Sequence, residues 1–356
     1  MVRRMIQSKQ ASANHSVWLL FTVQKSRFHF PIFYVLLLLC LASCATPPPT
    51  ALPSPTSTPP PIATSSPRSQ ATATQEPTFI APTLAPTPTA IATQTSSNNI
   101  LPIFDTHAHY SRNSWSLYSP QDIIAKLINA KVARALVSSS PDEGTRRLYE
   151  LDPVRIVPGL RPYHDDVTTT NWETSEKTLP YLEERIDSPM YVALGEIHVH
   201  VQNIESPIFR NAVKRALARN LILHIHSDAE TIRGVYKIAP DAKILWAHAG
   251  LIESPQTVSQ VLDEFPKLWT DISIREYSIA PNGKLSEEWR ALFLKHPDCI
   301  TIGSDTWIPE RWTSYEKIIE HDRAWLAQLP RDVAENIAYR NALKLFGMQD
   351  AGDLEK

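Results

Sequence analysis

Short apolar runs alternate with helix-like segments from residue 100 onward. The apolar runs span residues 101–106, 133–138, 154–159, 190–196, 221–226, 243–248, 268–273 and 299–305. The helix-like segments span residues 120–131, 142–151, 174–186, 206–219, 228–239, 255–265, 284–295 and 313–328. Such an alternation over about 250 residues is typical of one (β/α)₈ barrel, a TIM barrel, and predicts that residues 100–350 form one domain.

An extra helix is expected over residues 331–346, after the last strand–helix unit. Ser119-Pro120 and Ser206-Pro207 are typical helix starts, with serine as the cap and proline at the first helical position. A doubly wound open sheet is the alternative fold. That fold would need a glycine-rich phosphate turn or a switch-point site, and the sequence contains no G-x-G-x-x-G motif.

Residues that bind metals well stand at the ends of these apolar runs. His107 and His109 end the first run, and because strand side chains alternate faces, both point the same way, about 7 Å apart. Two imidazoles on one face can hold one divalent ion. Later runs end in Glu196, His226, His248 and Asp305. The pattern predicts a ring of ligands at the C-terminal ends of barrel strands.

Several neighbouring residues allow a second interpretation. His224 shares a face with His226, but His226 is nearer the strand end, so His224 is expected deeper as a hydrogen-bonded core histidine. Asp105 shares the face of His107 and is expected to orient an imidazole. His198 and His200 follow Glu196 and are interpreted as loop histidines, with the pocket mouth as the alternative.

Composition narrows the classes of partner. The formal net charge is −2 and the sequence pI is about 6.6, which gives no electrostatic reason to expect binding to nucleic acid or an anionic membrane surface. Of the three cysteines, Cys40 and Cys44 precede the barrel, so only Cys299 remains in it. An internal disulfide in the barrel is therefore impossible, and a cysteine-based zinc site is not expected.

The N-terminal region predicts that the protein is located outside the cytoplasm. Residues 31–43 form an apolar run of about 13 residues, preceded by Lys25 and Arg27, which suits a signal-peptide core better than a membrane span. Leu41-Ala42-Ser43-Cys44 resembles a bacterial lipobox, which implies cleavage after residue 43 and a lipid on Cys44. An uncleaved anchor helix is the alternative, and either arrangement tethers the protein to a membrane.

Residues 44–99 are expected to form a disordered linker. They consist mainly of proline, threonine, serine and alanine, and Arg68 and Glu76 are their only charged residues. Without apolar periodicity, such a segment cannot bury enough surface to offset the entropy lost on ordering. Its prolines favour an extended spacer.

The motifs resemble the amidohydrolase superfamily, in particular its TatD-like and amidohydrolase-related branches. The matching stretches are Phe104-Asp-Thr-His-Ala-His109, Ala193-Leu-Gly-Glu-Ile197, Leu223-His-Ile-His-Ser227, Trp246-Ala-His-Ala-Gly250, Gly303-Ser-Asp305 and the final helix through Phe346. The resemblance covers roughly residues 100–347. TatD-like proteins usually continue Ile-Gly-Leu-Asp after the glutamate, whereas here Ile197-His198-Val199-His200 follows, which argues against a nuclease substrate.

The resemblance implies a metal-dependent hydrolase acting on a small molecule. The implied ligands are His107, His109, Glu196, His226, His248 and Asp305, with Glu196 bridging two ions and Asp305 also serving as the general base. One or two divalent ions, expected to be zinc, would activate water for attack on an ester, lactone, amide or phosphoester. Arg161 and Arg275, at other predicted strand ends, are candidates to hold an anionic or polar substrate group.

Two other functions are compatible with the same sequence. The first is a metal-dependent, non-oxidative decarboxylase of the amidohydrolase-related type. Retention of Glu196 argues against it, because a carboxylate that bridges a second metal suits hydrolysis. The second is a non-catalytic surface lipoprotein that binds a ligand on an old enzyme scaffold, and the complete set of ligand-type residues argues against that.

Overall fold

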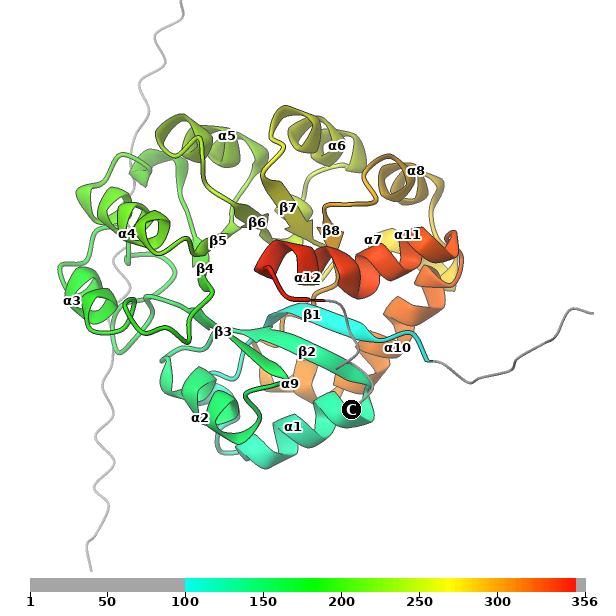
Figure 1. Ribbon diagram of the computed structural model, residues 1–356, viewed down its shortest axis with the longest axis horizontal. Coiled ribbons are helices and arrows are strands. Elements are labelled where there is room, and N and C mark those ends of the chain that lie inside the picture. The colour runs from blue at the N-terminus through cyan, green and yellow to red at the C-terminus, as the bar shows by residue number, and fades with distance from the viewer. Residues whose placement is uncertain (1–99, 350–356) are drawn as a thin grey trace, which may run out of the picture. The chain divides into compact units, whose positions relative to one another are not determined.

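The computed structural model describes residues 100–349, whose parallel strands are arranged in chain order around a barrel (Figure 1). The strands are β1 (Ile103–Ala108), β2 (Val132–Val137), β3 (Ile156–Leu160), β4 (Ala193–His198), β5 (Ile222–His226), β6 (Ile244–Trp246), β7 (Leu268–Asp271) and β8 (Ile300–Thr301). The Thr106 amide donates to the Ile302 carbonyl at 2.8 Å, which joins the β8 end of the sheet to β1. The predicted (β/α)₈ barrel is confirmed.

Helices follow the strands and surround them. The longer ones are α1 (Pro120–Asn129), α2 (Glu143–Leu151), α3 (Thr178–Glu183), α4 (Pro207–Ala218), α5 (Ala229–Ile238), α6 (Pro255–Glu264), α8 (Glu287–Lys295) and α10 (Tyr315–Leu326). Short helical turns are η1 (Arg112–Ser114), η2 (Val201–Asn203), η3 (Ala247–Gly250), α7 (Glu276–Ile279), η4 (Pro281–Gly283) and α9 (Pro309–Thr313). Ser119 and Ser206 accept the amide hydrogens of Asp122 and Phe209, as expected of helix caps.

The final helical segment closes one end of the barrel. It consists of α11 (Arg331–Glu335), the π-helical turn η5 (Asn336–Arg340) and α12 (Asn341–Phe346), and α12 lies across the strands in Figure 1. One residue from each of six strands packs with Leu343 and Leu345 in one apolar cluster: Phe104, Leu136, Val157, Ala193, Ile222 and Leu245. The Phe104 and Phe346 rings stack at 5.4 Å between centroids. The barrel thus has an apolar floor, and its polar residues gather at the opposite, C-terminal end of the strands.

The predicted signal segment (residues 1–43) and linker (residues 44–99), including Cys44, lie outside the described residues. Within residues 100–349, no helix is both long enough and apolar enough to cross a membrane.

Candidate metal centre

The structure brings the side chains of all six proposed ligands together at the C-terminal ends of the strands. His107 lies in β1, Glu196 in β4 and His226 at the end of β5. The other three residues follow strands: His109 follows β1, His248 lies in η3 after β6, and Asp305 follows β8. All are buried except His226, which is partly exposed.

The first group of facing atoms comes from His107, His109, Glu196 and Asp305. The two histidine Nε2 atoms are 3.1 Å apart, and Glu196 Oε2 lies 3.5 Å from His107 Nε2 and 3.3 Å from His109 Nε2. Asp305 Oδ1 lies 3.6 and 3.1 Å from the same two nitrogens. Zinc–ligand bonds of about 2.0–2.1 Å in a tetrahedron separate neighbouring ligand atoms by roughly 3.3 Å. The spacing therefore suits four ligands around one small ion.

The second group shares the other oxygen of Glu196. Glu196 Oε1 is 2.8 Å from His226 Nδ1 and 3.3 Å from His248 Nε2, and those two nitrogens are 3.1 Å apart. The Glu196 carboxylate thus faces two clusters of ligand atoms with one oxygen each. This is the arrangement required of a carboxylate that bridges two ions.

Hydrogen bonds on the far side of each ring leave lone pairs facing the centre. The Nδ1 of His109 meets the Ser138 carbonyl, that of His107 meets Asp271 Oδ2 at 3.2 Å, and that of His248 meets Ser273 Oγ at 2.8 Å. Because these partners accept, each ring carries its proton on Nδ1 when it is neutral.

Two observations show that a cation fits the first group. In the neutral rings, the Nε2 lone pairs of His107 and His109 face each other at 3.1 Å, an arrangement that needs a positive charge between them. Asp305 Oδ1 is buried and has no hydrogen-bond partner among the described residues. An ion here would satisfy all three atoms.

Asp271 is a site residue that the sequence analysis missed. Its carboxylate is fully buried, and Oδ2 accepts from His107 Nδ1 and from His224 Nε2 at 3.1 Å. Oδ1 accepts from the amides of His248 and Ser273 and from the Ser273 hydroxyl. One carboxylate therefore positions a histidine in each group. Asp271 ends β7, but the predicted run continued to residue 273, so the strand-end rule that identified Glu196 did not select it.

Opposite charges lie close together in the centre. Burial alone would lower the pKa of His107, but the charges of Asp271, Glu196 and Asp305 outweigh burial and raise that pKa well above 6.5. Burial opposes ionisation of the carboxyls too, yet His107 holds the pKa of Glu196 and of Asp271 well below the usual range. The same balance lowers the pKa of Asp305 to about 2.

Asp105 has a different role from the one predicted. The register of β1 on β2 shifts between Asp105 and Ala108, so Asp105 does not share the orientation of His107. Its carboxylate accepts from the His107 amide, from the amide and hydroxyl of Ser304, and from the Tyr315 hydroxyl. It therefore orients no imidazole but fixes the backbone next to Asp305.

The remaining histidines divide between the centre and the surrounding loops. His224 lies below the centre on Asp271, and burial, with the charge of His107, lowers its pKa to about 4, as expected of a core histidine. His198 stacks on His226 at 4.1 Å between ring centroids, and burial lowers its pKa to about 3. His200 lies apart and contacts Glu173. His198 is the last residue of β4 and not a loop residue, and its contact with His226 favours the alternative that it lies at the mouth of the site.

The two arginines proposed for substrate binding have different surroundings. Arg161 is buried and donates from Nε to the Glu196 carbonyl and from Nη2 to Glu196 Oε2, both at 3.1 Å. Arg275 donates instead to the carbonyls of His248, Ala249 and Glu253, which fixes the loop after β6. Arg275 is not among the residues that line the cavity described next.

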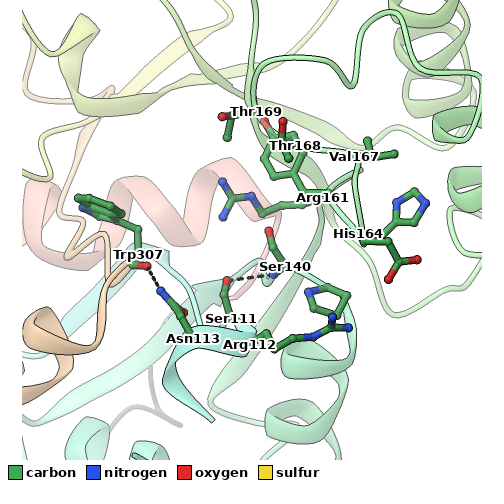
Figure 2. A pocket seen from close by; sticks show the side chains of 13 residues that line it. Ser111, Arg112, Asn113, Ser140, Arg161, His164, Val167, Thr168, Thr169 and Trp307 are labelled. Atoms are coloured by element: carbon green, nitrogen blue, oxygen red, sulfur yellow. Dashed lines mark hydrogen bonds between the residues drawn. The ribbon is translucent and has the colours of Figure 1, made fainter. Parts of the chain in front are cut away.

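A cavity of about 420 Å³ lies beside the centre, and Figure 2 shows its lining. It is lined by Ser111, Arg112, Asn113, Ser140, Pro141, Arg161, Tyr163, His164, Asp165, Val167, Thr168, Thr169 and Trp307. Arg161 belongs to this lining and also contacts Glu196, so the cavity and the centre share a residue.

Two of the nine described non-glycine residues with positive φ belong to the proposed ligand set. His248 has φ 58° and Asp305 has φ 45°, both in the left-handed region that costs non-glycine residues about 1–3 kcal/mol. Both side chains face the centre. Such outliers concentrate at functional sites, where the surrounding structure holds them in place.

Comparison with known proteins gives similarities to solved structures, whereas no curated protein matches. An amidohydrolase from Burkholderia multivorans with bound HEPES is 12% identical, with a TM-score of 0.47, over 69% of this chain and 99% of that chain. A TatD homolog from Escherichia coli K12 is 16% identical, with a TM-score of 0.48, over 69% and 98%. A putative 2-pyrone-4,6-dicarboxylic acid hydrolase from Pseudomonas putida is 16% identical, with a TM-score of 0.47, over 70% and 98%.

A family model described as "Amidohydrolase" matches residues 171–348, which is half of the chain. The matched segment contains Glu196, His226, His248 and Asp305, and the barrel fold supplies the first strand with the two remaining histidines. The chain belongs to the amidohydrolase family.

Proposed function

We propose that this protein is a metal-dependent hydrolase that activates water for attack on an ester, lactone, amide or phosphoester bond. The observation that carries the proposal is the position of Glu196, whose two carboxylate oxygens face two separate groups of ligand-type atoms at 2.8–3.5 Å. Buried lone pairs that face one another at these distances repel each other, which costs free energy unless a cation lies between them.

Each residue has a role in this proposal. The first ion would be held by His107, His109, Asp305 and one oxygen of Glu196. The second would be held by His226, His248 and the other oxygen. A set of imidazoles and carboxylates at these separations favours zinc. When bound, such an ion lowers the pKa of a coordinated water to about 7 and polarises the oxygen under attack.

Asp305 acts as the general base. Its Oδ1 lies among the ligand atoms of the first group, and its low pKa keeps it ionised at neutral pH. It accepts the proton of the attacking water and returns it to the leaving group. Asp105 keeps Asp305 in place through its bonds to the adjacent Ser304.

The experiment combines elemental analysis of the full chain with a panel of esters, lactones, amides and phosphoesters, each tested with and without chelator. We expect one or two zinc ions per chain, and turnover that chelation removes and zinc restores. His107→Ala and Asp305→Asn should each lower turnover at least about 100-fold, the effect typical of a lost general base. Asp241→Asn is the matched control, because Asp241 is an exposed carboxylate paired with Lys267.

Other outcomes would identify the alternatives. Turnover unaffected by chelation and by both variants would refute the proposal. Carbon dioxide release from unsaturated or aromatic acids, without hydrolysis of any panel member, would indicate a decarboxylase. Metal or ligand binding without any turnover would favour a binding lipoprotein.

We propose further that a lipid on Cys44 tethers the protein to a membrane outside the cytoplasm. The support is the apolar run at residues 31–43 and the lipobox-like sequence that ends in Cys44. In bacterial expression, Cys44→Ala should shift the protein from the detergent phase to the aqueous phase. An unchanged distribution, with an intact N-terminus by mass spectrometry, would support an uncleaved anchor instead.

A further inference from the structure

The cavity beside the metal centre is built by loops from neighbouring parts of the barrel rim. Its lining residues follow β1, β2, β3 and β8. Asn113 Nδ2 donates to the Trp307 carbonyl at 2.9 Å, and the Ser140 amide donates to Ser111 Oγ at 3.0 Å, as Figure 2 shows. The two bonds tie adjacent loops together, so the cavity is part of the built structure. Its volume lies within the range of small-molecule sites.

Arg161 joins the cavity to the centre. Its Nε and Nη2 bind Glu196, whereas Nη1 only approaches His109 Nδ1 at 3.2 Å. That nitrogen already donates to the Ser138 carbonyl, so it offers Arg161 no lone pair. Figure 2 shows the guanidinium pointing into the space between the lining residues. Arg161 is 6% exposed and lines the cavity, so its N–H groups that do not point at Glu196 can donate to a molecule bound there.

The rest of the lining favours a negatively charged ligand. Two of the lining side chains, Arg112 and Arg161, are cationic and one, Asp165, is anionic, and Glu196 pairs with one edge of Arg161. Serine and threonine hydroxyls add further hydrogen-bond donors: Ser111, Ser140, Thr168 and Thr169. Val167, Tyr163 and Trp307 provide apolar surface beside these groups. Cationic and hydroxyl donors next to an apolar wall suit a small organic molecule with one charged end.

We propose that this cavity binds an oxyanion group of the substrate, a carboxylate or a phosphate, while the bond to be broken lies at the metal centre. This inference rests on the proposed hydrolase function and specifies its substrate class as small anionic esters, lactones or amides. Arg161 supplies the inner donors and Arg112 the outer charge. The apolar wall contacts the uncharged part of the molecule.

Binding to the zinc-loaded full chain, measured by calorimetry, tests the proposal without requiring turnover. The probes are succinate and succinamate, which differ only in whether the second end is a carboxylate or an amide. A third probe, 3-phosphonopropionate, distinguishes a phosphate-type site from a carboxylate site. We expect succinate or the phosphonate to bind at least about tenfold more tightly than succinamate, because an ion pair with arginine replaces a hydrogen bond to an uncharged amide.

Arg112→Gln should reduce that preference to about threefold or less without changing zinc content, because Arg112 is exposed and contacts none of the proposed ligands. Arg210→Gln is the matched control, an exposed arginine on α4 paired with Glu205. Equal binding of the charged and amide probes would overturn the proposal, as would a preference that Arg112→Gln leaves intact. A retained preference in a protein that hydrolyses nothing would reject the proposed function alone.

Discussion

Asp271 offers the sharpest test of how the centre is organised. The perturbation is Asp271→Asn, which keeps the shape of the side chain but replaces one accepting oxygen with a donating NH₂ group. The carboxylate now accepts five hydrogen bonds from His107, His224, His248 and Ser273. In the amide, the NH₂ group must replace one of the two oxygens. It then faces either the N–H groups of His107 and His224 or the donors of His248 and Ser273.

The expected magnitude follows from these contacts. Removing a buried charged partner typically costs about 3–5 kcal/mol of folding stability, so the free energy of unfolding of the metal-free protein should fall by that order. Losing the carboxylate behind a ligating histidine typically weakens metal binding about 10–100-fold. Because Asp271 supports one histidine of each group, both zinc affinities should fall.

Ser273→Ala separates the two groups. The Ser273 hydroxyl connects Asp271 to His248 at 2.8 Å and also lies 3.2 Å from His107 Nδ1, but His107 keeps its direct bond to Asp271 when that hydroxyl is removed. Competition with a chromophoric chelator, combined with elemental analysis after dialysis, should show that Ser273→Ala weakens one zinc ion selectively. Asp241→Asn serves as the control at an exposed carboxylate. Wild-type zinc affinity in Asp271→Asn, or equal weakening of both ions in Ser273→Ala, would refute the reasoning.

Three further predictions concern pH and stability. Because the pKa of His107 is raised, its protonation stabilises the metal-free protein fully below about pH 6.5, and this stabilisation is lost as pH rises through the raised pKa. Zinc must displace that proton, so zinc affinity should rise with pH. Calorimetry in two buffers should detect the released proton. Burial raises the pKa of Asp322 from 3.8 to about 6, so the free energy of unfolding falls as pH rises between these values. In urea unfolding, Asp322→Asn should therefore raise the free energy of unfolding by roughly 1–3 kcal/mol at pH 8 and leave it unchanged at pH 3. Leu343→Ala should cost about 2–5 kcal/mol by opening a cavity in the barrel floor, and an unchanged melting temperature would contradict the assignment of α12 as its closure.

The strand–helix alternation was predictable because each strand is a short apolar run followed by a capped amphipathic helix. The expected boundaries of α1, α4, α6 and α10 agree with the structure within two residues, whereas the helix expected at 174–186 is limited to α3 (Thr178–Glu183) and the short helix α9 precedes the one expected at 313–328. The convergence of the six ligand-type residues was also predictable, because the C-terminal ends of parallel strands in a barrel meet at one rim.

What the sequence did not reveal depends on contacts between distant segments. The register shift after Asp105 reverses the expected alternation, and alternation was the only basis for its predicted role. Arg275 follows the end of a strand, as Arg161 does, but its guanidinium donates to backbone carbonyls of the loop after β6. Asp271 lay inside a predicted strand, and its importance becomes clear only when three histidines from other strands surround it.

The apolar floor under the barrel limits how small molecules reach and leave the site. Leu343, Leu345 and Phe346 come from the last helix, so the chamber stays open on one side until the end of the chain has docked. Once they are in place, reactant, water and product all have to pass through the same mouth. A single bulky molecule lodged between the rim loops would therefore halt uptake and discharge alike.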